Sequence, residues 1–241
     1  MIRLVVGGAL LVACAVPAVA GPPYETDDPE PTEFGHWEIY NFVNLDGRAG
    51  QVDGVAGLDL NYGGAKNLQL TATLPLAFAH ESGAAWRFGR GDVELAAKYR
   101  FVNDEKHGWQ AAVFPRVILP TATRGLGGTH ARVLLPLWVQ KDLGKTSVFG
   151  GAGYEINPGP GNRDFWQAGV AVTHDFSDKL SIGTEVAWQS PDAPGGHAST
   201  GVNLGLIRKL GGPFALLLAA GPSFSGGKAA YHGYAALSLN F

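Results

Sequence analysis

The last stretch of the chain, Ala230 to Phe241, reads Ala-Tyr-His-Gly-Tyr-Ala-Ala-Leu-Ser-Leu-Asn-Phe. Counting back from the end by twos gives a run of apolar or small residues, whereas the residues between them are mostly small or polar. This period of two predicts a β-strand with one apolar face. Phe241 lies on that face with no turn after it, an ending typical of the strand that closes an outer-membrane barrel.

Upstream of this strand, the chain divides into alternating segments of about ten residues, the length that a tilted strand needs to cross a bilayer. One of them places Asp92, Glu94, Lys98 and Arg100 on a single face. Because these charges exclude a dry core on that side, the face must meet water or polar partners. The predicted strands are 36–45, 53–62, 67–79, 91–101, 109–119, 130–140, 145–156, 164–176, 179–190, 199–209, 212–222 and 230–241.

The connections between these segments also alternate in character. Connections such as Gly63 to Lys66 are mostly tight, whereas 80–90, 120–129 and 191–198 are longer and mostly rich in Gly, Pro, Asn and Ser, and we expect 46–52 and 223–229 to be long as well. Short periplasmic turns and longer outside loops are typical of outer-membrane barrels. The sequence therefore predicts an all-β fold, an antiparallel up-and-down transmembrane β-barrel of about 12 strands over residues 36–241.

Closure of this barrel requires the first and last strands to pair, because lipid does not tolerate an open sheet edge. We therefore expect 36–45 to pair with 230–241. The first strand has the poorest alternation, since it turns Tyr40 and Phe42 inward and Asn41 toward lipid.

Aromatic residues fall in two outward-facing bands under this layout, as expected of the two membrane interfaces. A soluble β-sandwich would match the mean hydropathy of +0.04 equally well but gives no reason for such bands. A helical membrane protein is excluded, because after residue 20 no apolar run approaches about 18 residues. The periplasmic band holds Trp37, Tyr62, Phe101, Trp109, Phe176, Phe214 and Phe241, and the outer band holds Phe78, Tyr154, Trp166, Trp188 and Tyr231.

The amino terminus predicts a signal peptide over residues 1–20, with Arg3, an apolar run to Val16 and a small-x-small site at Ala18 to Ala20. A lipoprotein site at Cys14 is the alternative, although a closed barrel needs no lipid anchor. Cleavage would remove Arg3 from the 18 basic residues and leave 17 against 21 acidic ones, a net charge near −4 without cysteine. This composition excludes disulfides and gives no indication of nucleic-acid binding.

Residues 21–35 form an acidic, proline-rich leader that cannot pair regularly as a strand. Two interpretations are open. The leader is either a solvated periplasmic segment or a small plug whose carboxylates meet luminal Lys and Arg side chains.

A barrel of about 12 strands encloses a narrow, ligand-sized lumen. Its charged residues either pair across strands and stiffen the wall or contact a passing solute, and the two roles are compatible. Luminal aromatic residues, Tyr40, Phe42, Phe114, Trp138, Phe149 and Phe165, favour a path that tolerates apolar or aromatic solutes. The lumen-lining candidates are Glu38, Asp59, Asp92, Glu94, Lys98, Arg100, Arg116, Arg132, Glu155 and Glu185.

An enzyme of the lipase or protease type is a competing hypothesis, because His80, His130, His197 and His232 all fall near the outer rim with serines nearby in sequence. No spacing singles out a Ser/His/acid set, and no histidine pair has the short spacing of metal ligands. The sequence therefore predicts no catalytic residue, no metal site and no cofactor.

Several short motifs resemble one family. They are Tyr24-Glu-Thr-Asp-Asp-Pro29, Gly35-His-Trp-Glu-Ile39, Gly91-Asp-Val-Glu-Leu95, Lys98-Tyr-Arg-Phe101 and Val117-Ile-Leu-Pro-Thr121. Together they resemble the MetA-pathway of phenol degradation family of proposed outer-membrane transporters. The resemblance implies a Gram-negative outer-membrane barrel that passes small compounds, including aromatic ones. It supplies no catalytic or ligand-binding residues, and Ala122 stands where the family tends to have Gly.

These observations predict a channel for small solutes in the cell outer membrane, with an occluded structural barrel as a further alternative to the enzyme. The expected partners are the lipid bilayer, a small-molecule solute, and the barrel-assembly machinery, which would recognise the carboxyl-terminal strand that ends in Phe241.

Overall fold

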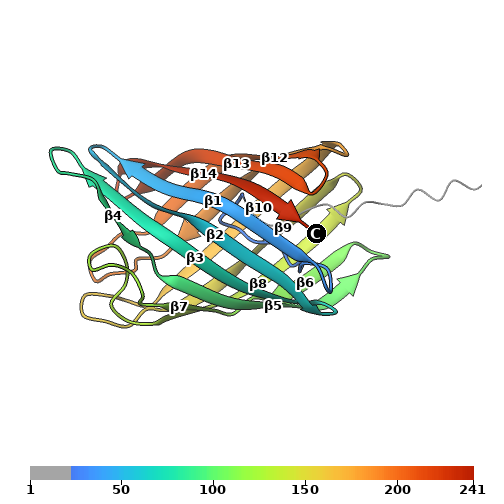
Figure 1. Ribbon diagram of the computed structural model, residues 1–241, viewed down its shortest axis with the longest axis horizontal. Helices are drawn as coiled ribbons and strands as arrows, with labels where there is room; N and C mark the ends of the chain where they lie inside the picture. The colour runs from blue at the N-terminus through green and yellow to red at the C-terminus, as the bar shows by residue number, and fades with distance from the viewer. Residues whose placement is uncertain (1–22) are drawn as a thin grey trace, which may run out of the picture.

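The computed structural model describes residues 23–241, most of which lie in one closed antiparallel sheet (Figure 1). Closure lets neighbouring strands satisfy every strand's backbone N–H and C=O groups, the requirement that lipid imposes on a sheet. The strands are β1 (Trp37–Arg48), β2 (Gln51–Ala65), β3 (Leu68–Glu81), β4 (Arg87–Arg90), β5 (Val93–Asp104), β6 (Trp109–Val113), β7 (Arg116–Leu119), β8 (Arg132–Leu143), β9 (Thr146–Ile156), β10 (Phe165–Ser177), β11 (Leu180–Gln189), β12 (Ser199–Gly211), β13 (Phe214–Ser225) and β14 (Lys228–Asn240).

The 14 strand segments correspond to 12 transmembrane strands, because two of those strands are interrupted. Both β4 and β5 pair with β3, and both β6 and β7 pair with β5 and β8. Pro115 causes the second interruption, since proline has no N–H to donate to the neighbouring strand. The predicted antiparallel barrel of about 12 strands is therefore confirmed.

The seam between β1 and β14 closes the barrel, as the sequence predicts. Glu38 lies opposite Asn240 and Arg48 opposite Ala230, so the two strands pair along almost their whole length. At the end of the seam, the Trp37 N–H donates to the Phe241 carbonyl at 2.7 Å and the Phe241 N–H donates back at 3.0 Å. No sheet edge remains at this seam.

The first strand has the inward and outward faces that its alternation predicts. Tyr40 and Phe42 are buried in the lumen, whereas Asn41 is exposed on the outside. The two inward rings pack with Ile207, Leu217 and Ala236 in a cluster of apolar side chains inside the barrel. The poor alternation of this strand thus reflects an apolar inner wall at that position.

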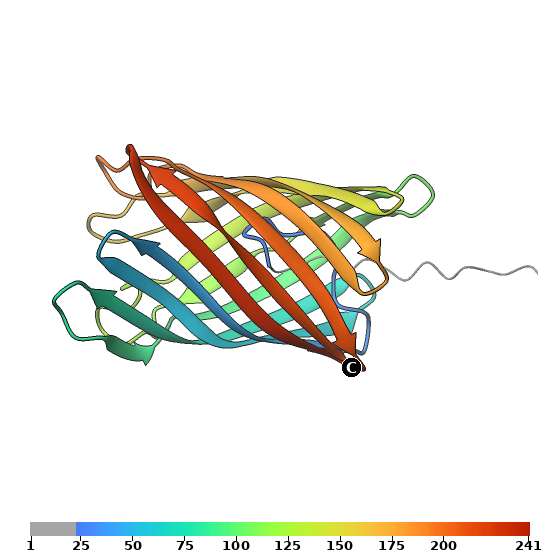
Figure 2. The same ribbon diagram turned by 90° about the horizontal axis from the view of Figure 1, so that it is seen from above.

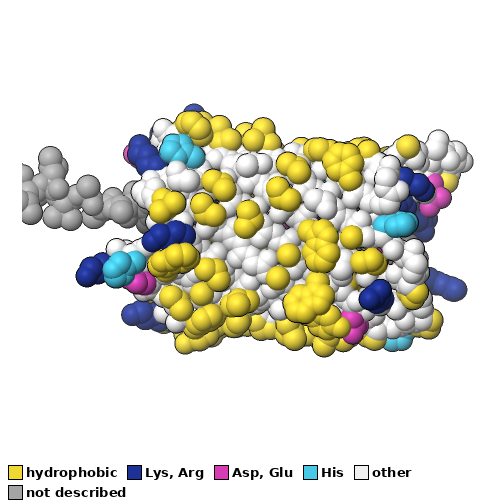
Figure 3. Space-filling model, turned by 180° about the vertical axis from the view of Figure 1, so that it is seen from behind, with side chains coloured by type: hydrophobic (Ala, Val, Ile, Leu, Met, Phe, Trp, Pro, Cys, Tyr) yellow, Lys and Arg dark blue, Asp and Glu magenta, His cyan; other side chains and the backbone are white. Residues whose placement is uncertain are grey.

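The outer surface is apolar between two charged ends. Figure 3 shows hydrophobic side chains over the middle of the strands, with Lys, Arg, Asp, Glu and His gathered at both ends. The predicted bands are present at the exposed rings of Trp37, Phe101, Trp109, Phe176, Phe214 and Phe241 at one end and of Trp166, Trp188 and Tyr231 at the other, and Trp86 and Phe88 add to the second. This exterior suits a bilayer and not water.

Two predictions of long loops are wrong. The segments 46–52 and 223–229 are not long loops, because β1, β2, β13 and β14 extend into them and leave only the turns Ala49–Gly50 and Gly226–Gly227. Gly50, Gly226 and Gly227 have φ values of +75°, +56° and +75°. These left-handed conformations permit two-residue hairpins that continue the twist of the strands. The long connections of this end are 82–86, 120–131, 157–164 and 190–198.

Among the described residues, no helix is long and apolar enough to cross a membrane.

The exposed belt gives a direct test of the bilayer. Leu204 is 66% exposed near the middle of β12, and Leu210 is 57% exposed at its end. Because the cost of a lipid-facing Arg falls from about 2–4 kcal/mol at the midplane to about 0–1 kcal/mol near the interface, L204R should destabilise the barrel far more than L210R. Urea unfolding in phospholipid vesicles measures the difference. Equal costs at the two positions would contradict a membrane-embedded belt.

Candidate functional site

Residues 23–35, which we call the leader, run inside the barrel (Figure 2). Thr26 is 1% exposed and Asp28 is 0% exposed, so the walls of the barrel enclose this part of the leader completely. At the end that holds Trp37 and Phe241, which we call the terminal end, Phe34 bridges to Gly63 of β2. From there the leader extends into the lumen, where its backbone and side chains contact several strands.

Glu185 anchors the inner part of the leader. Its carboxylate accepts hydrogen bonds from the backbone N–H of Glu25 at 3.0 Å and of Thr26 at 2.9 Å. The side-chain amide of Asn203 donates to the same carboxylate at 2.9 Å. A buried carboxylate that accepts three N–H groups is well compensated for its loss of water.

Asp27 makes the strongest side-chain contact of the leader. Its carboxylate bridges the Lys98 ammonium at 2.9 Å and the Arg116 guanidinium at 2.8 Å. The ring of Phe114 lies under both cations, 4.9 Å from the Lys98 nitrogen and 4.3 Å from the Arg116 central carbon. We refer to Lys98, Phe114 and Arg116 as the cationic clamp. Burial raises the pKa of Asp27, but the Lys98 and Arg116 charges outweigh it, so the net pKa is lower than usual.

Asp28 has the opposite environment. One of its oxygens accepts the backbone N–H of Glu30 at 2.6 Å, whereas the other is buried without a hydrogen-bond partner. Burial raises the pKa of Asp28 well above its ordinary value despite the Lys98 charge 3.7 Å away. The pKa values of two adjacent leader carboxylates are therefore shifted in opposite directions, because the charges of Lys98 and Arg116 outweigh burial only at Asp27.

The leader is also held near the terminal end by amide side chains. Gln110 and Gln140 donate to the Glu30 carboxylate at 2.7 Å and 3.0 Å. Gln69 accepts the backbone N–H of Thr32 at 2.8 Å. These glutamines come from β6, β8 and β3, so the leader links three parts of the wall.

Glycines in the strands make room for the leader. A Cβ atom at Gly205 would collide with the ring of Tyr24, one at Gly183 with the Tyr24 hydroxyl, and one at Gly169 with the Thr26 hydroxyl. Glycine within a strand commonly marks a close approach of this kind. The wall of β10, β11 and β12 is thus shaped to the leader.

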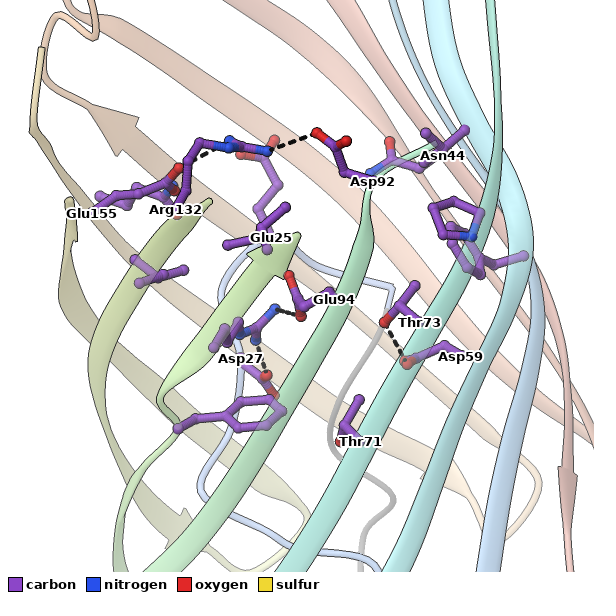
Figure 4. A pocket seen from close by; sticks show the side chains of 18 of the residues that line it. Glu25, Asp27, Asn44, Asp59, Thr71, Thr73, Asp92, Glu94, Arg132 and Glu155 are labelled. Carbon is purple, nitrogen blue, oxygen red and sulfur yellow. Dashed lines mark hydrogen bonds and ion pairs between the residues drawn. The ribbon is translucent and has the colours of Figure 1, made fainter. Parts of the chain in front are cut away.

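A cavity of about 720 Å³ lies beyond the leader, toward the end opposite the terminal end. Leader residues Tyr24 and Asp27 lie on one side of it, and Leu126 and Gly127 of the 120–131 loop lie on another. Figure 4 shows the charged side chains that converge on this space from several strands. Its volume falls in the range of ordinary small-molecule sites.

The two sides of this cavity differ in chemistry. One side, which we call the aromatic wall, consists of Tyr40, Phe42, Val55 and Tyr234, and the rings of Phe42 and Tyr234 stack with centroids 6.3 Å apart. These residues lie on β1, β2 and β14, where Glu38 and Asp59 also line the cavity, and a charged wall lies on β5, β7, β8 and β9. The charged wall consists of Glu94, Lys98, Arg116, Arg132 and Glu155, together with Asp92 just before β5.

Ion pairs connect the charged wall along its length. Arg116 lies 3.4 Å from Glu94, and Arg132 lies 2.9 Å from Glu155 and 3.7 Å from Asp92 (Figure 4). Acidic residues still outnumber basic ones around the cavity, at Glu25, Asp27, Glu30, Glu38, Asp59, Asp92, Glu94 and Glu155 against Lys98, Arg116 and Arg132. The space is therefore electronegative with the leader in place.

A second cavity of about 910 Å³ opens at the end opposite the terminal end. Leu126 and Arg132 line both cavities, so the 120–131 loop lies between them. Asp92 holds this loop by accepting the backbone N–H of Ala122 at 3.0 Å and of Gly128 at 2.7 Å. A side chain at Gly127 would collide with Asp92, which explains glycine there.

The structure places the predicted lumen-lining residues inside the barrel and brings most of them around one space. Glu38, Asp59, Asp92, Glu94, Lys98, Arg116, Arg132 and Glu155 line the 720 Å³ cavity. Arg100 instead donates to Gln110 at 2.6 Å, and Glu185 lies beneath the leader. Among the described residues, Glu38 and Asp59 have no Lys, Arg or His nitrogen within 4.0 Å. The sequence left open whether the leader carboxylates meet luminal Lys and Arg side chains, and it singled out no individual leader residue; the structure pairs Asp27 with Lys98 and Arg116.

Three of the rim histidines contact side chains other than serine. His80 stacks on Trp86 with centroids 4.7 Å apart, His130 contacts the Thr129 hydroxyl at 2.9 Å, and His232 contacts Asp46 at 3.1 Å. Within residues 23–241, no serine hydroxyl is hydrogen-bonded to a histidine ring, and no cluster of side chains is suited to a metal ion.

The barrel is similar to solved outer-membrane proteins at low sequence identity. The COG4313 outer membrane channel from Pseudomonas putida F1 matches with a TM-score of 0.71 and 16% identity, covering 89% of this chain and 98% of that one. The KdgM porin in complex with disordered oligogalacturonate has a TM-score of 0.59 and 11% identity, over 85% and 99% of the two chains. The translocator domain of the autotransporter NalP from Neisseria meningitidis has a TM-score of 0.56 and 15% identity, over 86% and 88%.

No protein-family model and no curated protein matches the chain. The resemblance to the MetA-pathway family therefore remains an interpretation of short motifs. The fold and the apolar exterior give a coarser conclusion. The chain is an outer-membrane β-barrel that resembles channels and porins in its architecture.

The two adjacent leader aspartates give a matched pair of variants. A lowered pKa means that ionised Asp27 stabilises the docked leader above its ordinary pKa and loses this effect as the pH falls. A raised pKa means that Asp28 opposes docking increasingly as the pH rises above its ordinary value. D27N should therefore release the leader at neutral pH, whereas D28N should leave it docked.

Thiol labelling measures the release, because Thr26 is buried when the leader is docked. In a T26C background, we expect D27N to raise the rate of maleimide labelling roughly tenfold or more, since two charge-assisted hydrogen bonds are lost. Equal rates for D27N and D28N would contradict this account of the two carboxylates.

Proposed function

We propose that this protein is a channel for small solutes in the outer membrane and that the leader is its plug. The observation that carries the proposal is the lumen itself, which holds a 720 Å³ cavity on the path between the leader and the outer loops. The aromatic wall and the charged wall offer both apolar and polar contacts to a solute there. Similarity in fold to channels and porins supports the same class of function.

The leader obstructs the path toward the terminal end. Thr26, Asp28 and Pro29 are completely enclosed, and the leader contacts wall residues as far apart as Gln69 of β3 and Asn203 of β12. A solute therefore passes only when the leader moves. Because the leader contacts the wall through hydrogen bonds and ion pairs, it can exchange these contacts for water when it leaves.

The leader also sets the charge of the lumen. It contributes Glu25, Asp27, Asp28 and Glu30, whereas Lys98, Arg100 and Arg116 face it from the wall. With the leader docked, the acidic excess favours cations. Without the leader, Lys98 loses both of its acidic partners and Arg116 retains only Glu94, so the lumen becomes more favourable to anions.

Single-channel recording in planar bilayers tests the plug. We expect deletion of residues 23–35 to increase the conductance severalfold and to shift the K⁺/Cl⁻ selectivity toward chloride, because the deletion removes both an obstruction and carboxylates. A matched control carries a leader of the same length and composition in scrambled order, which cannot reproduce the contacts of Asp27 and Glu30.

The outcomes separate the alternatives. Absence of conductance from the well-folded deletion variant would leave an occluded structural barrel as the function. Identical conductance and selectivity for the intact and deleted proteins would retain the channel and overturn the plug.

We further propose that the barrel-assembly machinery recognises β14. Asn240 is the last residue of β14, and Phe241 follows it. Phe241 is 58% exposed on the outer surface beside the seam. F241A should lower the amount of folded barrel in cells, measured as the heat-modifiable band on a gel, while purified protein refolds into detergent as before. An unchanged yield in cells would contradict this role.

A further inference from the structure

The cationic clamp provides one positive charge for each oxygen of the Asp27 carboxylate. Lys98 and Arg116 approach the two oxygens of Asp27 separately, at 2.9 Å and 2.8 Å. The Lys98 side chain is 4% exposed, so its charge is almost removed from water. A buried ammonium requires an anionic partner, and in the docked state the leader supplies it.

The clamp also retains unused donor capacity. Arg116 donates one N–H to Asp27 and one to Glu94, the latter at 3.4 Å, while its Nε group is buried without a hydrogen-bond partner. The Arg116 side chain is 23% exposed and lines the 720 Å³ cavity together with Lys98 and Phe114. A molecule in the cavity thus has direct access to the same guanidinium that holds the leader.

The surroundings of the clamp indicate the rest of the ligand. Phe114 provides an apolar face under the two cations, and the aromatic wall with Tyr40, Phe42 and Tyr234 lies across the cavity. A compact ligand with a carboxylate at one end and an apolar ring at the other would satisfy both sides. Neutral and cationic analogues would leave the buried Lys98 without its partner.

We propose that the cationic clamp is a binding site for small carboxylates and that Asp27 of the leader occupies it as an internal ligand. A solute carboxylate then competes with Asp27 for Lys98 and Arg116, and binding of the solute displaces the plug. The displacement of the plug by a solute rests on the proposed function, but the binding site itself can be tested without any measurement of transport.

Binding to the barrel that lacks residues 23–35 is the first test. Isothermal titration in detergent compares benzoate with benzyl alcohol and benzylamine, which have a similar ring and no negative charge. We expect benzoate alone to bind. K98M and R116M should each weaken its binding roughly tenfold or more, because each removes a charge-assisted contact. K141M is the control, since Lys141 lies over Trp109 and outside the cavity.

Folding must be checked for each variant. Heat-modifiable gel migration identifies barrels that have folded, and R116K provides a second variant that keeps the charge while removing the planar fork. We expect R116K to bind benzoate more weakly than the parent and more tightly than R116M. Failure of the deleted barrel to bind benzoate, or equal binding of benzyl alcohol, would overturn the proposal.

Competition in the full-length chain is the second test. Benzoate should increase maleimide labelling of T26C in a concentration-dependent manner, whereas benzyl alcohol should not. If benzoate binds the deleted barrel but never exposes position 26, the displacement of the plug is wrong. If binding and displacement occur but bilayers show no conductance, the proposed channel fails while the carboxylate site stands.

Discussion

Every strand of a sheet in lipid must find hydrogen-bond partners on both sides, and this requirement governs the whole molecule. The seam between β1 and β14 meets it, because the two strands pair from Glu38 and Asn240 to Arg48 and Ala230. Once the sheet is closed, its two faces meet different environments. The outer face contacts lipid with leucines, valines and aromatic rings, and the inner face holds charged side chains such as Glu94, Lys98 and Arg116.

Closure at 12 transmembrane strands leaves an interior that wall side chains fill only in part. Apolar side chains from β1, β12, β13 and β14 pack together on one side, whereas the opposite side has buried cations such as Lys98. An unpaired cation in that position would be costly, and the leader compensates it with Asp27. The leader is therefore part of the electrostatic balance of the interior as well as an obstruction in it.

Alternation in the sequence predicts the strands, the seam and the inward rings of Tyr40 and Phe42, because side-chain direction in a strand is a local property. The turns at Ala49–Gly50 and Gly226–Gly227 were expected to be loops, since alternation fades among glycines and small residues near hairpins. The position of the leader depends on contacts such as that between Thr26 and Glu185, which are distant in sequence. Local patterns do not identify which residues pair in this way. The opposite charges of the leader's carboxylates and the luminal Lys and Arg indicate only that some pairing is favourable.

The covalent link between the leader and β1 has a quantitative consequence. Asp27 lies ten residues before Trp37, the first residue of β1, in the same chain. Its local concentration at Lys98 and Arg116 is therefore fixed, and short tethers typically give values in the millimolar range. A free anion must reach a comparable concentration before it replaces a tethered one. In the proposed displacement, lengthening the exposed residues 33–36 just before β1 would lower the solute concentration at which the barrel opens, while Glu30 and Thr32 keep their contacts with the wall.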